Sequence, residues 1–137
     1  MSSTPNFTGT PVVDRALITT ADTSRVTPTN GGTAFFAPPG ALGGMCERIT
    51  VFPNASIASK TVARIFHYDG AIAMLKAEIP LPVMTISLTD AVTPIVLSAV
   101  DYPQLFPMLV EPNASLRATV NDVQASGVII VGEGGGF

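Results

Sequence analysis

KTVARIFHYDGAIAMLKAEI, residues 60–79, is the stretch of sequence that decides the fold. It consists of two largely apolar runs, 60–68 and 71–79, separated by Asp69-Gly70. Asp-Gly between two such runs is a strong signal of a β-hairpin, because both central positions of the tight turn favour residues that tolerate positive φ. The second run is rich in good helix formers, so a helical turn over 71–79 remains an alternative.

Two other segments alternate apolar and polar residues as a half-buried strand does. In the first, Met84, Ile86 and Leu88 point one way and hydroxyl residues point the other, and 115–120 repeats the pattern. The alternation predicts one buried face for each segment.

The remaining apolar runs are short and bounded by turn residues. Runs 94–100 and 105–110 are apolar at both alternating sets of positions. This predicts that both of their faces are covered, one by the second sheet and the other by a neighbouring subunit. Further strands are expected at 12–20, 33–37, 47–52 and 127–131. Short strands at this regular spacing predict an all-β fold, namely a single antiparallel β-sandwich that is jelly-roll-like.

Composition divides the chain into three parts. Residues 1–11 are mostly Ser, Thr, Pro, Asn and Gly, too polar to order themselves, and are expected to form a flexible or partner-bound extended N-terminal arm. Residues 12–132 form the β-sandwich domain. Residues 133–137 are expected to be a mobile glycine-rich tail.

Four apolar residues near the two ends of the chain are the candidate interface anchors. Phe7, Val12 and Val13 would anchor the arm on a partner, and Phe137 would anchor the tail. No catalytic, cofactor-binding or metal-binding residue is assigned.

The charge content points to association. Apolar residues make up 47% of the chain and charged residues 12%, and the mean hydropathy is +0.45. An ordinary soluble domain has about twice that share of charges. Apolar surface should therefore remain after folding, and such surface marks association. A homo-oligomer is expected, with a trimer as the first choice.

Other classes of partner fit the sequence poorly. The net charge is -3 and no basic stripe is present, so nucleic-acid binding is not expected. The longest uncharged stretches are broken by proline and shorter than the ~20 apolar residues of a membrane span, so no membrane association is expected. The start of the chain lacks the features of a signal peptide, so synthesis in a reducing cytoplasm is expected.

Catalytic chemistry is not expected either. His67 is the sole histidine and Cys46 the sole cysteine, so a metal site would have half its ligands at best. A reading of Ser56, His67 and Asp69 as a triad lacks the nucleophile elbow and the oxyanion loop. Four carboxylates lie about one strand apart and are read as loop charges rather than as a calcium site. They are Asp90, Asp101, Glu111 and Asp122.

One short motif occurs twice. Pro53-Asn54-Ala55-Ser56-Ile57 is echoed by Pro112-Asn113-Ala114-Ser115-Leu116. The repeat is interpreted as two similar turns, in which Asn and Ser satisfy local backbone groups, in preference to a duplicated half-sandwich.

Several segments together resemble a known group of proteins. They are Cys46–Pro53, Thr61–Phe66, Leu116–Val120, Val128–Val131 and the ending Gly134–Phe137. The arrangement resembles small structural proteins encoded among bacteriophage head and tail genes, over roughly residues 46–137. It is a pattern of strands and turns, without a catalytic signature.

The resemblance implies a role in the virion. The implied function is a capsid decoration or cement protein, a non-enzymatic subunit on the capsid surface that bridges neighbouring capsomers and has the phage major capsid protein as its partner. A phage tail or receptor-binding module with the same β-sandwich fold is the alternative. Such a module should display aromatic residues, and Tyr68 and Tyr102 are the two tyrosines available.

Overall fold

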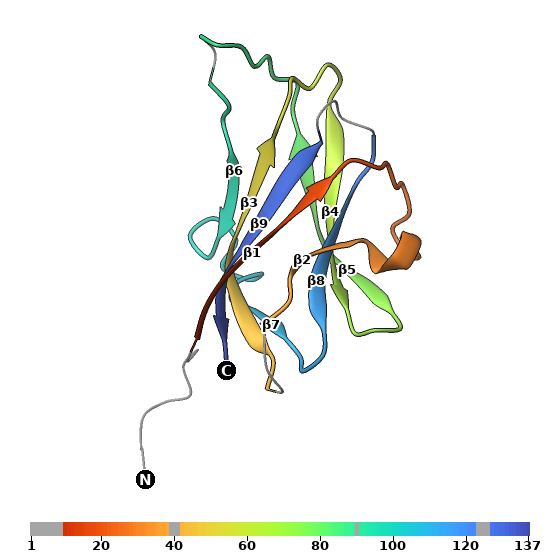
Figure 1. Cartoon of the computed structure of the whole chain (residues 1–137), viewed down its shortest axis with the longest axis vertical. Coiled ribbons are helices and arrows are strands. Elements are labelled where there is room, and N and C mark those ends of the chain that lie inside the picture. Colours follow the sequence, from red (N-terminus) through yellow and green to blue (C-terminus); the bar gives the residue numbers. More distant parts are fainter. Residues whose placement is uncertain (1–9, 39–41, 90, 123–126) are drawn as a thin grey trace.

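The computed structural model describes residues 10–38, 42–89, 91–122 and 127–137 (Figure 1). The described residues contain nine strands and the 3-10 turn η1 (Thr29–Gly31), so the all-β prediction is confirmed. The strands are β1 (Thr10–Ile18), β2 (Thr33–Phe36), β3 (Gly44–Pro53), β4 (Thr61–Tyr68), β5 (Ala73–Leu81), β6 (Ile95–Ser98), β7 (Met108–Val110), β8 (Ser115–Val120) and β9 (Val128–Gly136).

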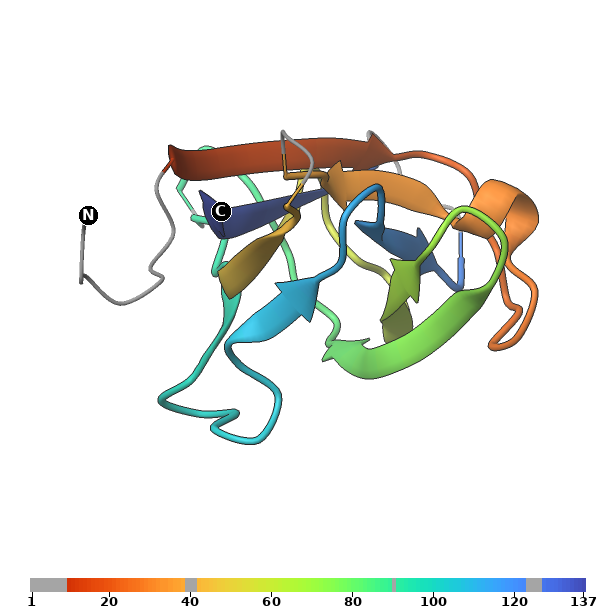
Figure 2. The same ribbon diagram turned by 90° about the horizontal axis from the view of Figure 1, so that it is seen from below.

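The strands form two antiparallel sheets, as the sandwich prediction requires. The first sheet has the order β1-β9-β3-β6, with β7 pairing a different part of β3, and the second has the order β2-β8-β4-β5. At one side of the sandwich β1 and β2 lie next to each other (Figures 1 and 2). The chain passes back and forth between the sheets, so almost every strand has neighbours that are distant in the sequence.

The hairpin predicted over residues 60–79 is present as β4 and β5. Tyr68 pairs with Ala73, and residues 69–72 form the loop between them. The Asp69 carboxylate accepts hydrogen bonds from the backbone N–H groups of Ala71 and Ile72, and backbone hydrogen bonds lower the pKa of this carboxyl. Gly70 has a φ of 101°, which favours glycine. The alternative of a helical turn over 71–79 is therefore wrong.

The prediction of a strand over residues 84–88 is wrong. Only Met84 pairs with another segment, through an isolated bridge to Ile57, and Leu88 is fully exposed. The segment projects beyond the end of the sheets (Figure 1), where no sheet face is available to bury the apolar side chains. The Ser56 hydroxyl accepts the N–H of Ile86, a bond that a neighbouring strand would otherwise supply.

The two runs that are apolar on both parities form shorter strands than expected. In β6, Leu97 is buried in the core while Val96 is exposed, and in β7 Leu109 is exposed between two buried neighbours. Within the subunit each strand is therefore covered on one face only.

The prediction of a separate glycine-rich tail at 133–137 is also wrong. Residues up to Gly136 belong to β9, which pairs with β1 on one side and β3 on the other. The glycines are needed for packing, since a Cβ at Gly134 would lie 1.9 Å from the Met45 carbonyl oxygen. A Cβ at Gly132 would lie 2.8 Å from the Phe36 ring.

The core lies between the sheets. Phe35 and Phe36 of β2 are fully buried and face the first sheet, where Gly132 leaves room for the Phe36 ring. Ile65 of β4 and Leu116 of β8 are fully buried from the second sheet. The core is therefore held by contacts between segments that are far apart in the chain.

Residues 19–32, here called the strap, lie over the outer side of the second sheet. The Arg25 guanidinium bonds to the Glu78 carboxylate of β5, and the Asp22 N–H bonds to the Val120 carbonyl of β8. Under this cover Phe66 and Arg64, which lie on the outer side of β4, are buried. The second sheet is thus covered on both of its faces.

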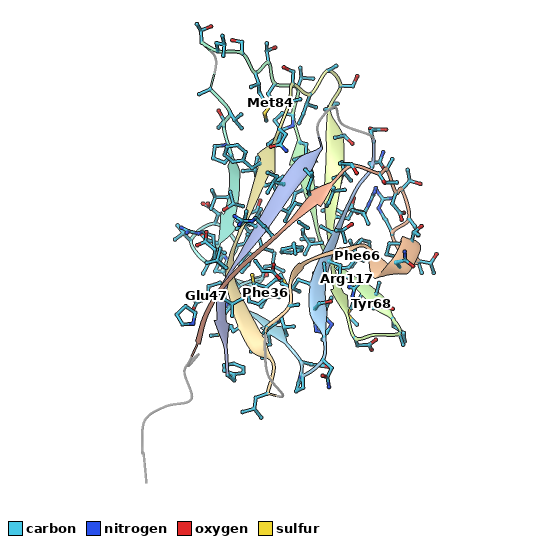
Figure 3. The ribbon with its side chains drawn as sticks, in the orientation of Figure 1. Phe36, Glu47, Phe66, Tyr68, Met84 and Arg117 are labelled. Carbon is cyan, nitrogen blue, oxygen red and sulfur yellow. The ribbon has the colours of Figure 1, made fainter. Side chains whose placement is uncertain are left out.

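The strap is also held at η1. The Arg117 guanidinium donates to the carbonyl of Asn30 and lies over the Tyr68 ring, 4.4 Å from its centroid (Figure 3). Gly31 is required here, because a Cβ at this position would meet the Tyr68 ring at 2.6 Å.

The two copies of the repeated motif form turns, as the sequence indicated. Asn113 has a φ of 64° and lies in a turn closed by the Ala114 N–H and the Glu111 carbonyl. The Asn54 N–H bonds instead to the Gly127 carbonyl. The two copies therefore share a sequence but not a hydrogen-bonding pattern, and the Ser56 hydroxyl bonds to Ile86 rather than to a local backbone group.

Candidate protein interface

The outer face of the first sheet has no counterpart to the strap among the described residues. Because side chains alternate along a strand, the residues between the buried ones point to this side. The register arranges them in three rows across the strands β1, β9, β3 and β6. The rows are Leu17, Ile129 and Phe52, then Arg15, Val131, Thr50 and Val96, then Val13, Glu133, Arg48 and Ser98. These residues are here called the outer face.

The outer face is largely apolar and exposed. Val13 is 70% exposed, Leu17 51%, Val96 43% and Phe52 38%. Ile129 and Val131 lie between them and are partly exposed. Single exposed apolar residues are ordinary on protein surfaces, but a contiguous set on one sheet face is typical of an interaction site.

The charges of the outer face lie toward one end. Arg48 of β3 forms an ion pair with Glu133 of β9, its neighbour in the register. Both side chains are partly exposed, so the pair adds little to the stability of the subunit. Arg15 of β1 is the other charged member. Glu47, the bulge residue next to Arg48 in β3, is exposed and lines the same groove as Arg48 and Glu133. The other members of the three rows are uncharged.

The candidate anchors fall at different places. Val13 lies on the outer face, in a groove that Val100 also lines, and Val100 is itself exposed. Val12 points to the other side of β1 and packs against the core. The Phe137 N–H bonds to the Gly43 carbonyl, and this residue is half-buried. Phe7 lies outside the described residues.

Several members of the outer face are not among the anchors chosen from the sequence. Leu17 shares the parity of Val13 in β1, so the alternation in 12–20 could have found it. Phe52, Val96 and Val131 could not be found in the same way, because their strands contain apolar residues on both parities. Which face of these strands stays uncovered depends on which face packs against the second sheet.

The Ser56, His67 and Asp69 triad is not assembled. Ser56 and Asp69 lie at opposite ends of β4, and each is engaged locally, Ser56 with Ile86 and Asp69 with its own hairpin loop. His67 is half-buried and lines a hollow near Leu105 and Met108. In the described ranges, no three side chains of His, Cys, Asp or Glu gather in a way that could hold a metal ion.

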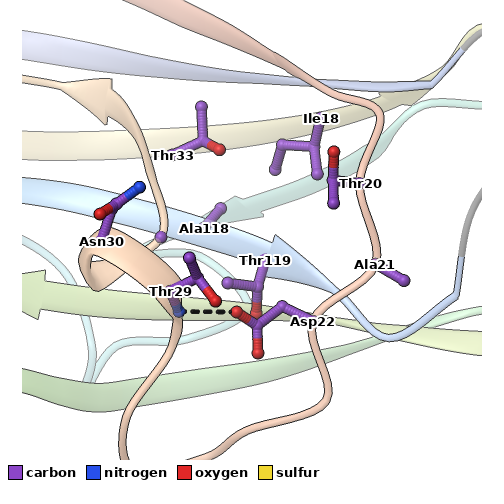
Figure 4. Close-up of a pocket in the computed structure, with 10 residues that line it drawn as sticks. Ile18, Thr20, Ala21, Asp22, Thr29, Asn30, Thr33, Ala118 and Thr119 are labelled. Atoms are coloured by element: carbon purple, nitrogen blue, oxygen red, sulfur yellow. Dashed lines mark hydrogen bonds between the residues drawn. The ribbon is translucent and has the colours of Figure 1, made fainter.

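A small polar cavity of about 260 Å³ lies between the strap and β8 (Figure 4). Asp22 accepts a hydrogen bond from the Thr29 N–H across its mouth. Burial alone would raise the pKa of the Asp22 carboxyl. Hydrogen bonds from the backbone N–H groups of Thr29 and Ser24, together with the Arg64 charge, outweigh burial and hold this pKa below its usual value. The carboxylate is therefore explained by its role in fixing the strap.

Cys46 is a structural thiol. Its side chain is fully buried in β3, and burial raises its pKa to about 12. A thiol rather than a thiolate is therefore present at neutral pH, and a thiol is a poor nucleophile and metal ligand.

Comparison with protein families, with curated proteins and with solved structures found no match. Among the described residues, no helix has the length and apolar character needed to cross a membrane.

Proposed function

We propose that this chain is a structural subunit of a bacteriophage particle, a capsid decoration or cement protein that acts by binding neighbours. The observation that carries the proposal is the outer face. It exposes Val13, Leu17, Phe52 and Val96 on one side of the sheet, and the fold of the single subunit does not use this surface. A second protein surface packed on it would remove these side chains from water, at roughly 25 cal/mol for each Å² of apolar area buried.

The strand order supports the proposal. Because β6 and β7 pair with successive parts of β3, we infer that they take the place of one interrupted strand. Each sheet then has four strands, and the chain alternates between them as in a jelly roll, an architecture that recurs in viral capsid proteins.

The proposed action is mechanical. A subunit bound to two neighbouring capsomers adds contacts that must break before the capsomers separate, so the shell withstands more internal pressure. Such a role requires complementary surfaces and no chemistry. The partners are a second copy of this chain and the major capsid protein, and the location is the outside of the virion.

Residues 1–9 are proposed to bind the capsid. The arm expected at 1–11 has a different inner boundary in the structure, because Thr10 and Pro11 already belong to β1 and pair with Gly136 and Gly135. Thr10 lies beside the C-terminal end of β9, so β1 begins at this end of the sandwich. Whether they bind the capsid stays a prediction.

Removal of residues 1–9 is expected to leave the melting temperature unchanged and to weaken attachment to the particle by about tenfold or more, a loss of roughly 1.4 kcal/mol. The melting temperature should hold because β1 keeps all its partners. The measurement is occupancy on particles that lack the native copy, by quantitative gel analysis after sedimentation. Phe7→Ser in the full chain is the milder matched variant. Equal occupancy of the full and shortened chains would argue against the capsid-binding arm.

A further inference from the structure

The register of the first sheet points to one specific occupant of the outer face. We propose that a second copy of this chain packs on it about a two-fold axis that runs parallel to the strands, between β9 and β3. The inference rests on the proposed function and specifies its self-association as a dimer, in place of the trimer expected from the sequence. A two-fold contact joins the same patch on both copies, so the patch must be complementary to itself.

The charges satisfy this requirement. Rotation about this axis places β9 of one copy over β3 of the other. Each row of residues then lies over the same row of the second copy. Glu133 of each copy then faces Arg48 of the other, so the two ion pairs present within the subunits become a cluster of four alternating charges. Within the three rows no like charges face each other directly, and Glu47 of the β3 bulge lies beside Arg48 at this end of the face.

The apolar residues match under the same rotation. Ile129 of each copy faces Phe52 of the other copy. Val131 faces Thr50, and Val13 at the margin faces Ser98. In the second row, Arg15 of each copy faces Val96 of the other copy. This contact lies at the edge of the face, where the guanidinium group can reach water.

The other in-plane axis, perpendicular to the strands, is less favourable. It would place the first row over the third, so that Phe52 would face Arg48 and Ile129 would face Glu133. Each charge would then lose water and gain no opposite charge. Charge complementarity therefore selects the axis along the strands.

The size of the face is also adequate. The strands β1, β9 and β3 are nine or ten residues long and β6 has four. At ~4.8 Å between strands and ~3.3 Å per residue, the outer side of the sheet spans roughly 20 Å by 30 Å along its three long strands. The accessible area of such a corrugated surface exceeds its projection, and a stable interface needs about 800 Å² on each partner. The face is of the size that a dimer requires.

The test exchanges charges between copies. Arg48→Glu gives a face with two acidic residues in the centre, and Glu133→Arg gives one with two basic residues. The wild-type protein is expected to sediment as a dimer at micromolar concentration. Each variant alone should dimerise at least about 30-fold more weakly because like charges would meet at the axis. An equimolar mixture of the two variants should form heterodimers with an affinity near that of the wild type.

Val131→Lys is the apolar counterpart and is expected to yield monomers. Val26→Lys, on an exposed strap residue of the other sheet, is its matched control and should remain dimeric. A wild-type monomer, a trimer, single variants that dimerise like the wild type, or a mixture that stays monomeric would each overturn the two-fold contact. Binding to phage particles would still be observed if this contact is wrong and the proposed function right. If the chain forms this dimer but binds no phage particle, the two-fold contact is right and the proposed function is wrong.

Discussion

Gly134→Ala is expected to lower the free energy of unfolding by more than about 3 kcal/mol, a large share of the roughly 5–15 kcal/mol that stabilises a typical domain. The added methyl would lie 1.9 Å from the Met45 carbonyl oxygen and 2.9 Å from the Cys46 Cα. Both are backbone atoms of β3, which is paired along β9, so neither can move without breaking the ladder. Urea unfolding followed by circular dichroism measures the effect.

Gly70→Asn is the matched control for this substitution. A Cβ at Gly70 meets no atom within 4 Å, and asparagine tolerates positive φ better than other residues do. Its expected cost is below about 1 kcal/mol, from backbone strain alone. If Gly134→Ala were as stable as Gly70→Asn, the close approach of β9 to β3 would be refuted.

Phe36→Ala is expected to cost about 3–5 kcal/mol, the range for removal of a buried aromatic ring. Phe36 is fully buried, and its ring occupies the space left by Gly132 of the opposite sheet. Thermal and urea unfolding both report the loss, and Phe36→Leu should recover a large part of it because leucine refills most of the volume.

A double-mutant cycle isolates the contact between these two residues. Gly132→Ala alone should destabilise the protein by about 1–3 kcal/mol through overpacking against the Phe36 ring. In the Phe36→Ala background the clash with the ring is removed while the close contact with the Cβ of residue 36, at 2.9 Å, remains, so the cost of Gly132→Ala should fall without vanishing. Additive effects of the two substitutions would show that Gly132 and Phe36 do not share this space.

The local part of the fold could be predicted from the sequence. Asp69-Gly70 identified the β4–β5 hairpin because the turn depends on residues next to each other. The helix formers of the second run did not decide its structure, since strand pairing with β4 outweighs local propensity. The turn at Asn113 was likewise a local matter.

The errors arose where structure depends on distant partners. Residues 84–88 alternate as well as any strand, but they extend past the end of the sheets and find no face to cover them. The glycines of β9 suggested a mobile tail, whereas their function is to let Met45 and Phe36 approach closely. Neither contact can be read from the local sequence.

The sequence indicated that an apolar surface would stay exposed, but it located only part of that surface. The low charge content indicated leftover apolar surface, and Val13, one of the four candidate anchors, is exposed on the outer face. Arg64 and Phe66 show why the position of this surface was hidden: they lie on an outer face too, yet the strap buries them. Only the tertiary path of residues 19–32 decides which sheet stays open.

Electron cryo-microscopy of intact phage particles tests the proposed role most directly. A short epitope inserted after the fully exposed Leu88 would mark the chain without touching either sheet. Labelled density is expected on the outside of the head, at junctions between capsomers, with the outer face covered by protein. Particles that carry no label anywhere, although the tagged chain is made and folded, would contradict a structural role in the virion.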